Sequence, residues 1–526
     1  MSFSEKSKHQ KKGNFLSSKK NIIISLAILA IVGFIVRINF VSFELPIILD
    51  GLVYFWYAID MSQSGYFPNG YSNLSNNGWP AFLSIFFMTF SSSDFMELMG
   101  LQRTISIILS TITIIPVYFL TKRFVGNYFA IFADSLFIFD PRIIQNSTLG
   151  ITEPLFLILL TSSIMFFLKK DFKSIYIAFA LASLATIVRV EGIFLLLVLS
   201  IGIFWFYKDQ KKEFVKYGIC LAVVFLILTP MLIIRTETSG NDGIISRFVY
   251  SAETIDQNAV NREVEDRNQL VLLGFENYVK FLGWSLIPIF VIFVPIGFIL
   301  ILKNRQTDSN FVILTGFILS IPIVYGLSVA SDTRFLFTLY PLFCILGAIS
   351  LKTFFEWKNI NQKIIIIIII AVLITSLGFL EYKKTDFEHE KEALEISKIV
   401  FEKTNKINLY TPESKYLPIN ELLQLENFPV IRTEQGIPYQ LVDYGIPILE
   451  DFETLNDGYE YFKDNKITHM VIDDKNNNKK LKDIFLNEID YPYLTKIYDS
   501  NDDNFNYKLK IFEIDYQKWK QTIIKN

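Results

Sequence analysis

Residues 364–382 read IIIIIIIAVLITSLGFLEY and begin with seven consecutive isoleucines. A short run of isoleucines in water would form a buried strand, but the apolar stretch continues for the length of a membrane span. A helix needs roughly 20 apolar residues to cross the hydrocarbon core of a bilayer. Similar stretches recur along the chain, so the sequence predicts a mainly α-helical, polytopic membrane bundle of about eleven spans. The other expected spans are 21–40, 101–121, 124–141, 150–168, 174–190, 191–207, 217–236, 279–302, 310–330 and 334–351.

Composition supports a membrane protein and excludes several classes of function. Of the 526 residues, 51% are hydrophobic without counting glycine, whereas soluble domains reach about 45–50% with glycine included. The net charge of -2 argues against a bulk basic surface for nucleic acid. The two cysteines, Cys220 and Cys344, lie in apolar runs, and the histidines His9, His389 and His469 lie in polar terminal segments. A disulfide framework, a thiolate metal site or a histidine triad is therefore not expected.

The distribution of lysine and arginine predicts the orientation, because cytoplasmic loops are enriched in both residues. Residues 1–20 form a basic tail before a first span that lacks a signal-peptide cleavage site, whereas 41–100 contain no lysine or arginine. We therefore expect a multi-pass protein of the cell membrane with a cytoplasmic N-terminus. The segment 79–90 is apolar but too short to span, so we expect an interfacial or re-entrant element. Basic residues also mark every second later junction, at Lys122–Arg123, Lys169–Lys170, Lys208–Lys212, Lys303–Arg305 and Lys352–Lys363.

The same pattern predicts three domains: a cytoplasmic tail at 1–20, a transmembrane catalytic domain at 21–382 with a first external loop at 41–100, and an extracytoplasmic domain at 383–526. The last has ordinary soluble composition. It contains helix-like and strand-like stretches, typical of a small α/β domain. The expected helices are 387–403 and 477–487, and the expected strands are 407–410, 467–472, 494–498 and 507–514. Residues 237–278 are expected to form an external loop.

Ionisable residues gather at the predicted external ends of the spans. Charges near a membrane helix are costly and therefore suggest function. A cleft lined by carboxylates and arginines would suit transfer of a sugar from a lipid phosphate. Arginines bind the anionic leaving group, and a carboxylate accepts the proton of the attacking hydroxyl. The residues in question are Asp50, Arg103, Glu153, Arg189, Glu191, Asp332 and Arg334.

Each of these residues also has a purely structural interpretation. Asp50 would be a solvated loop residue, and Glu153, followed by a proline, would be a carboxylate facing a helix N-terminus. Arg189 and Glu191 would pair with each other, and Arg334 would anchor the helix at the membrane interface.

The aromatic run at 54–57 (Tyr-Phe-Trp-Tyr) also has two interpretations. Tyr54 and Tyr57 would stack on a sugar ring, or the run would form an interfacial aromatic belt.

At these positions the sequence resembles the protein O-mannosyltransferase and lipid A aminoarabinose transferase families, membrane glycosyltransferases of the GT-C class. The resemblance covers about residues 20–380 and depends on the order of several short pieces. They are Asp50 with Tyr54 and Tyr57-Ala58, Gly65-Tyr66-Phe67-Pro68, Asn77-Gly78-Trp79-Pro80, Lys122-Arg123-Phe124-Val125-Gly126, Thr152-Glu153-Pro154-Leu155, Arg189-Val190-Glu191-Gly192, and Arg334-Phe335 with Tyr340-Pro341-Leu342.

The resemblance implies an inverting transferase that uses a polyprenyl- or dolichyl-phosphate sugar as donor and a protein, lipid or glycan as acceptor. Asp50 would be the catalytic base and Glu153 the second acid, and the two would hold Mg²⁺ or Mn²⁺ if a metal is used at all. The donor phosphate would bind Arg189, Arg334 and Arg103. The supporting residues would be Glu191, Asp332, Tyr54 and Tyr57.

The chain departs from these families in two places. Gly51 follows Asp50, where the families often carry a second acid. The Trp-Trp-Asp signature of oligosaccharyltransferases is absent, which disfavours transfer of a whole oligosaccharide. Two other functions remain open at this stage, a lipid-linked glycan flippase or polymerase and a transporter or scaffold without transferase chemistry. A transporter would favour repeat symmetry and broken helices.

Overall fold

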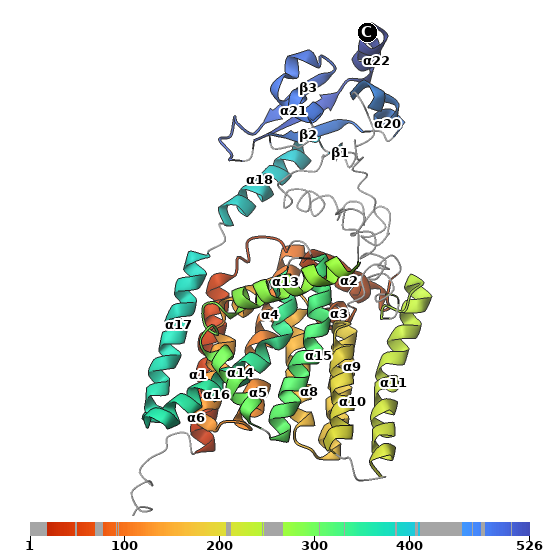
Figure 1. Cartoon of the computed structure of the whole chain (residues 1–526). Helices are drawn as coiled ribbons and strands as arrows, with labels where there is room; N and C mark the ends of the chain where they lie inside the picture. Colours follow the sequence, from red (N-terminus) through yellow and green to blue (C-terminus); the bar gives the residue numbers. More distant parts are fainter. Residues whose placement is uncertain are drawn as a thin grey trace, which may run out of the picture. The chain divides into compact units, whose positions relative to one another are not determined.

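The computed structural model divides the chain into two compact units, each considered by itself (Figure 1). The first comprises residues 1–41 and 61–384, and the second comprises 42–60 and 385–526. The structure describes residues 18–47, 50–68, 77–90, 92, 94–206, 212–244, 246, 267–304, 306–330, 332–383, 387–404, 409–410, 455–464, 467–474, 479–506 and 508–525.

The first unit is a helix bundle, which confirms the predicted polytopic α-helical fold. Within the part of the chain that the structure describes, six helical segments are long and apolar enough to cross a membrane, and six shorter helices are also apolar. The helices are α1 (Lys19–Phe40), α3 (Gly78–Thr89), α4 (Phe95–Ile112), α5 (Ile114–Lys122), α6 (Asn127–Ile138), α7 (Pro141–Ser147), α8 (Glu153–Phe167), α9 (Phe172–Val188), α10 (Gly192–Phe206), α11 (Lys212–Ser239), α13 (Arg267–Leu286), α14 (Phe293–Lys303), α15 (Thr307–Val329), α16 (Tyr340–Lys358) and α17 (Ile365–Tyr382). The chain division falls within helix α2 (Asp50–Ser64), of which 50–60 belong to the second unit and 61–64 to the first.

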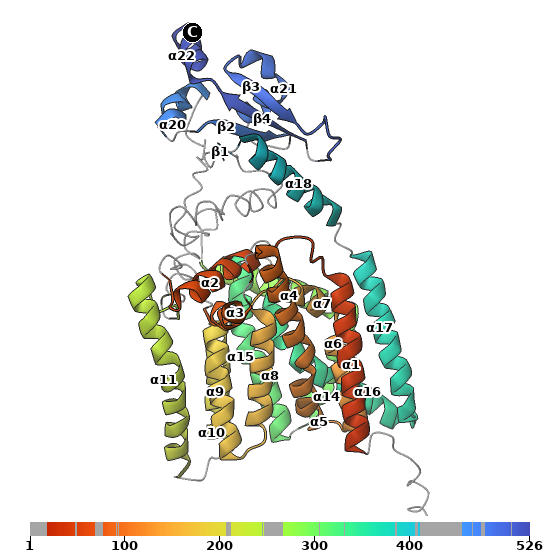
Figure 2. The ribbon, with the colours of Figure 1, turned by 180° about the vertical axis from the view of Figure 1, so that it is seen from behind.

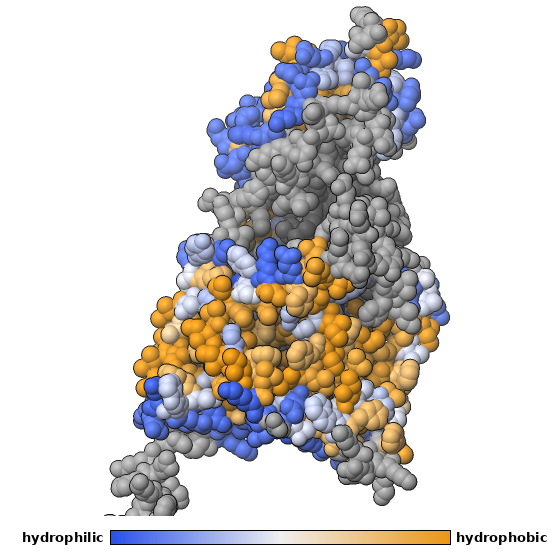
Figure 3. Space-filling view, in the orientation of Figure 1, coloured by the Kyte–Doolittle hydropathy of each residue, from blue (hydrophilic) through white to orange (hydrophobic). Residues whose placement is uncertain are grey.

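The outer surface of the bundle is apolar where a bilayer would contact it. Large hydrophobic side chains point outward from several helices, including Ile31 of α1, Leu226 of α11, Phe317 of α15 and Ile367 of α17. Figure 3 shows a belt of hydrophobic residues on one face of the bundle, with polar residues beyond each edge. Such a surface is stable only in contact with lipid, because water would not accept so large an apolar area.

A buried arginine fixes the first helix to the rest of the bundle. The Arg37 guanidinium donates to the carbonyl of Ile138 at 2.9 Å and to the hydroxyl of Ser110 at 3.2 Å. These bonds join α1 to α4 and to the end of α6, beside which α1 stands in Figure 2. A charged side chain with no exposed surface is tolerated here because neighbouring oxygens accept its hydrogen bonds.

An ion-pair network shows that two of the predicted basic junctions, at Arg123 and Lys170, share one end of the bundle. Asp308, in the first turn of α15, lies 2.5 Å from Arg123 after α5 and 2.5 Å from Lys170 between α8 and α9. The opposite ends of α8, α9 and α15 must therefore lie together at the other face, where the sequence predicts the chemistry.

The predicted span 279–302 is wrong as a single helix. Helix α13 ends at Leu286, and α14 begins only at Phe293 after an irregular turn that contains Pro288. Helix α13 begins at Arg267, inside the expected 237–278 loop, and lies across the other helices (Figure 1). Hydropathy alone did not reveal this, because the last residues of α13, the turn and α14 are all apolar.

Helix α3 agrees with the expectation of a short element at 79–90. Its 12 residues extend about 18 Å, well short of a hydrocarbon core of about 30 Å. Its first residues contact the segments before α8 and after α9, so it lies at the end of the bundle away from Asp308.

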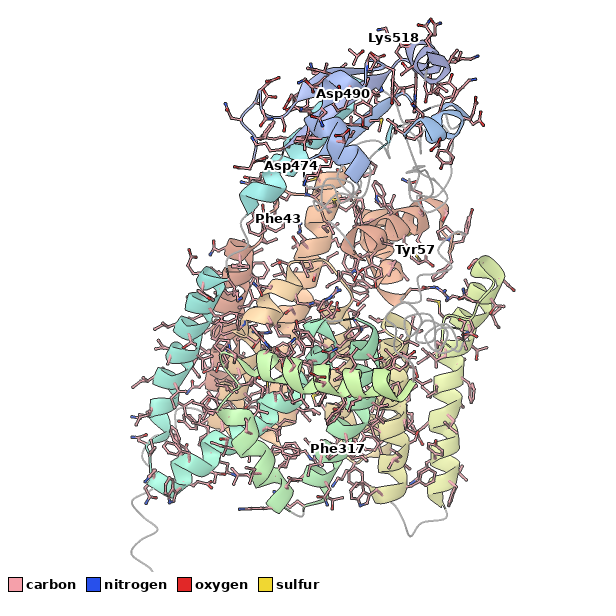
Figure 4. The ribbon with its side chains drawn as sticks, turned by 45° about the horizontal axis from the view of Figure 1, so that its top comes forward. Phe43, Tyr57, Phe317, Asp474, Asp490 and Lys518 are labelled. Carbon is pink, nitrogen blue, oxygen red and sulfur yellow. The ribbon has the colours of Figure 1, made fainter. Side chains whose placement is uncertain are left out.

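The second unit contains the expected small α/β fold. Its four-stranded sheet has the order β1-β2-β4-β3, with β1 parallel to β2 and the other pairs antiparallel. Trp519 is completely buried in its core and stacks on Tyr493. The elements are α18 (Phe387–Thr404), β1 (Leu409–Tyr410), α20 (Tyr459–Asp464), β2 (His469–Asp473), α21 (Lys479–Leu486), β3 (Leu494–Asp499), β4 (Leu509–Ile514) and α22 (Tyr516–Lys525). Asp474, Asp490 and Lys518 mark this unit in Figure 4.

Candidate active site

The first part of the site comes from the start of α8 and the turn between α9 and α10. Glu153 is the first residue of α8, and Pro154 follows at a position where a helix does not need its N–H. Arg189 ends α9 with extended backbone. Gly192 then begins α10 so close to α9 that a Cβ would lie 2.5 Å from the backbone nitrogen of Thr186. This tight turn returns the chain and places Arg189 opposite Glu153.

Arg189 holds two carboxylates at once. Its Nη1 donates to Oε1 of Glu153 at 2.6 Å and to the hydroxyl of Thr152 at 3.2 Å. Its Nη2 donates to Oε1 of Glu191 at 2.7 Å. The expected pairing of Arg189 with Glu191 and the expected position of Glu153 at a helix N-terminus are both present. They belong to one connected cluster.

The cluster is screened from water to different degrees along its length. The side chain of Glu153 is 5% exposed and that of Arg189 is 13% exposed, whereas Glu191 is 21% exposed. The guanidinium also lies 5.9 Å from the ring centre of Phe156. Electrostatic interactions are strong in such a partly dry site, so the Glu153–Arg189 pair is a rigid component and Glu191 is the more accessible carboxylate.

Arg334 enters the same site from the segment that precedes α16. It lies in the 3-10 helix η2 (Thr333–Leu339), whose N-cap Asp332 accepts hydrogen bonds from the Arg334 backbone at 2.8 Å and from its Nε at 2.5 Å. The side chains of Arg334 and Asp332 are each about one third exposed. Glu153, Arg189, Glu191 and Arg334 line one cleft, which we call the polar cleft. Its other walls are Phe156, Leu157, Leu319, Pro322, Ile323, Phe335, Phe337 and Thr338.

The remaining predicted residues are not among those that line the polar cleft. Asp50 begins α2 in the second unit, so its distance from Glu153 stays a prediction. Tyr54 and Tyr57 are buried side chains of the same helix. Arg103 is buried on α4 and is not among the residues that line the polar cleft.

The Glu153 carboxylate does not suit a metal ion in this arrangement. One oxygen accepts from Arg189 and the other accepts from Thr152 at 3.3 Å. Among the residues that the structure describes, no three His, Cys, Asp or Glu side chains gather at a spacing that would hold a metal.

Solved structures resemble this chain in fold, although no protein-family model and no curated protein sequence matches it. An oligosaccharyltransferase, AglB from Archaeoglobus fulgidus, solved with an inhibitory peptide and a dolichol-phosphate, aligns with a TM-score of 0.56 at 13% identity, over 92% of this chain and 74% of that one. ArnT from Cupriavidus metallidurans, solved with undecaprenyl phosphate, aligns with a TM-score of 0.54 at 10% identity, over 94% and 98% of the two chains. The fold is the GT-C fold. At these identities the likeness concerns the fold alone.

A second cleft of the GT-C bundle lies on the other side of α15 and is almost entirely apolar. Its volume is about 280 Å³, and we call it the apolar cleft. Phe298 and Phe317 line it and are also 40% and 62% exposed on the outer surface; Figure 4 labels Phe317 on α15. The cleft is therefore accessible from the lipid. Its lining comes from α13 (Tyr278, Leu282, Leu286), α14 (Val294, Pro295, Phe298, Ile301), α15 (Val312, Ile313, Gly316, Phe317, Ser320), η2 (Leu339) and α16 (Leu342, Phe343, Leu346).

The two clefts are adjacent, because residues next to each other in the sequence line one cleft and the other. Ser320 and Leu339 line the apolar cleft, whereas Leu319 and Thr338 line the polar one. One turn of α15 and the η2 segment thus separate a charged cleft from an apolar cleft, an arrangement that suits an amphipathic ligand.

Sequence reasoning missed several residues that shape the site. Trp79 Nε1 and Gln102 Nε2 both donate to the carbonyl of Gly150, at 2.9 Å and 2.6 Å. Arg235, near the end of α11, donates to Asn77. A charge inside an apolar span was a usable signal for Arg235, whereas nothing in the sequence singles out the carbonyl of Gly150.

Proposed function

We propose that the chain is a membrane glycosyltransferase that moves a monosaccharide from a polyprenyl-phosphate donor to an extracytoplasmic protein, lipid or glycan acceptor. The observation that carries the proposal is the polar cleft, which combines Glu153, Arg189, Glu191 and Arg334, beside an apolar cleft open to lipid. The neighbouring folds support it, because ArnT was solved with undecaprenyl phosphate and AglB with a dolichol-phosphate.

The donor would divide between the two clefts according to polarity. Its hydrocarbon tail would occupy the apolar cleft, and its phosphate would bind in the polar cleft. Arg334 suits the phosphate best, because its pair with Asp332 is one third exposed, and such surface pairs are weak and easily exchanged. Arginine also presents two parallel donors to a phosphate.

Arg189 and Glu153 would have a supporting role at the reaction centre. Arg189 already binds Glu153 and Glu191, so its charge is largely balanced. A phosphate that binds nearby would compete with Glu191, the more exposed carboxylate. Glu153 would keep the guanidinium oriented, and the fixed dipoles would stabilise charge that develops on the leaving group.

The reaction would be a single inverting displacement. A carboxylate accepts the proton of the acceptor hydroxyl while that oxygen bonds to the anomeric carbon of the sugar. The bond from the anomeric carbon to the phosphate oxygen breaks, and its electron pair leaves with the polyprenyl phosphate. We assign the base to Asp50, as the sequence resemblance implies, and no step passes through a metal or another cofactor.

Reconstituted full-length chain tests this function. It would be given radiolabelled undecaprenyl-phosphate monosaccharides, one sugar at a time, with membrane and cell-surface fractions as acceptors. Transfer of label to a lipid, glycan or protein fraction, lost in Arg334→Gln, is the expected result. If no sugar is transferred and undecaprenyl phosphate does not bind, the glycosyltransferase proposal fails.

A further inference from the structure

The segment Asn77-Gly78-Trp79, at the start of α3, contacts both sides of the Glu153–Arg189 pair. On one side Gly78 packs against the backbone of Val188, the residue before Arg189. A Cβ on Gly78 would lie 2.8 Å from the Val188 nitrogen and 2.9 Å from its Cα. Real Cβ atoms do not approach backbone so closely, so only glycine allows this contact without displacing the Arg189 turn.

On the other side the same segment holds the chain that leads into α8. Trp79 is completely buried, and its Nε1 donates to the Gly150 carbonyl at 2.9 Å, three residues before Glu153. Gln102 of α4 donates to the same oxygen at 2.6 Å. Two hydrogen bonds to one carbonyl fix the segment before Glu153 more firmly than a single bond would.

Arg235 holds the segment in place from a third element. It lies near the end of α11, a helix with few buried residues along its apolar stretch, yet Arg235 itself is only 2% exposed. Its Nη1 donates to Oδ1 of Asn77 at 2.5 Å, and its Nη2 donates to Oδ1 of Asn241 at 2.9 Å. A lipid-facing helix thus carries one buried charge, and that charge binds the residue next to Gly78. A buried guanidinium needs such acceptors.

We infer that Asn77-Gly78-Trp79 is a positioning clamp for the polar cleft, held in place by Arg235. The two segments that carry Glu153 and Arg189 are distant in sequence, and the clamp contacts both. The position of the Val188 backbone relative to the Gly150 carbonyl is therefore set by a three-residue segment that does not line the cleft. None of the clamp residues acts on substrate. The inference rests on the proposed function and deepens it, because the clamp would align the Glu153–Arg189 pair beside the donor phosphate.

Equilibrium binding of undecaprenyl phosphate to the full-length chain in nanodiscs tests the clamp. Gly78→Ala should weaken binding at least about five-fold, because the added Cβ must displace the turn that carries Arg189, and preorganised sites are sensitive to shifts of about 1 Å. Gly218→Ala on α11 is the matched control, since a Cβ there meets nothing within 4 Å. Asn77→Leu should weaken binding similarly, and Asn77→Asp, which keeps an acceptor for Arg235, should restore it.

The outcomes separate this inference from the proposed function. If Arg334→Gln leaves undecaprenyl phosphate binding unchanged, the donor site itself is misplaced. If Arg334→Gln weakens binding but Asn77→Leu and Gly78→Ala bind like wild type, the clamp alone is refuted. Helical circular dichroism and monodisperse elution establish that each variant is folded. Should Gly78→Ala fail to fold, the comparison of Asn77→Leu with Asn77→Asp decides the matter, because both substitutions keep a side chain of similar volume and only aspartate keeps an acceptor for Arg235.

Discussion

The guanidinium of Arg189 lies 2.6 Å from the carboxylate of Glu153, although the two residues are 36 positions apart in the sequence. The pair joins the residue that follows α9 to the first residue of α8. It is buried at the Glu153 side and accessible at the Glu191 side. The pair is thus both a structural joint and the inner wall of the polar cleft.

Removing the cation should cost more stability than removing the carboxylate. Arg189→Met leaves both Glu153 and Glu191 without this partner, whereas Glu153→Gln leaves Arg189 paired with Glu191. Breaking a buried ion pair costs about 3–5 kcal/mol, so we expect a clearly lower melting temperature for Arg189→Met and a smaller decrease for Glu153→Gln. Thermal unfolding in detergent measures both.

The more exposed ion pair of Arg334 with Asp332 provides the control for this stability prediction. Arg334→Met breaks an ion pair that is one third exposed and should cost about 0–1 kcal/mol. If Arg334→Met lowers the melting temperature as much as Arg189→Met, burial does not determine how much each ion pair contributes to stability.

The sequence predicted the polytopic helical bundle and the common end at which Glu153, Arg189, Glu191 and Arg334 lie, because both follow from simple energetic costs. Apolar length defines a helix that crosses lipid, and charges at helix ends tend to face a common polar region. The alternation of basic junctions was enough to place these four residues at one end of the bundle.

The same reasoning could not find the break between α13 and α14 or the contacts of Arg235. Residues 279–302 are apolar on both sides of the turn at Pro288, so hydropathy does not register it. The partners of Arg235 and Trp79 are Asn77 and the Gly150 carbonyl. Such pairings arise from tertiary packing between distant segments and leave no periodic signal in the sequence.

Filling the apolar cleft should weaken binding of the donor lipid. Gly316 lines this cleft, and a Cβ there would meet Leu342 only at an ordinary 3.6 Å, so Gly316→Ala should bind undecaprenyl phosphate like wild type. Gly316→Phe should weaken binding by about three- to five-fold. The effect is moderate because a lipid tail already lies in apolar surroundings and gains only packing contacts in the cleft.

The control for the added ring is Gly218→Phe, which places it on the open surface of α11. Equal binding by Gly316→Phe and Gly218→Phe would mean that the tail lies outside the apolar cleft.

Asp50→Asn should abolish sugar transfer without affecting donor binding. A general base contributes about 10²–10⁴-fold to a rate, and an amide cannot accept the proton of the acceptor hydroxyl. We expect at least about 100-fold slower transfer with an unchanged dissociation constant for undecaprenyl phosphate. Glu44→Gln is the control, because Glu44 is 79% exposed in its ion pair with Lys391. Retention of transfer by Asp50→Asn would assign the base to another residue.

The second unit should lose stability in acid through Glu488. The hydrogen bond from Lys496 holds the pKa of Glu488 below its usual value, burial opposes this, and the bond from Lys510 adds to it. A lowered carboxylate pKa stabilises the fold above the unfolded value near 4.5, and this contribution disappears as the pH falls through the folded value. Glu488→Gln should therefore increase hydrogen exchange in β3 and β4 at pH 7, and the difference from wild type should vanish below about pH 4.

An exposed acid of the same unit is the control for this effect. Glu460 on α20 is 73% exposed and lies 4.0 Å from Lys463, so Glu460→Gln should exchange like wild type at both pH values. A Glu488→Gln difference that persists undiminished in acid would show that the glutamine disturbs packing rather than an ion pair.

The orientation of the membrane unit decides where the acceptor must be. Leu149 lies at the end of the bundle that carries the polar cleft and is 46% exposed, whereas Lys303 is exposed at the end of α14. In a Cys220→Ala, Cys344→Ala background, Leu149→Cys should react with a membrane-impermeant maleimide on intact cells, and Lys303→Cys should react only after permeabilisation. The basic junctions near Lys303 require this result if cytoplasmic loops are enriched in lysine and arginine. The opposite pattern would place the polar cleft in the cytoplasm, where an extracytoplasmic acceptor could not reach it, and the proposed sugar transfer would then need a cytoplasmic acceptor.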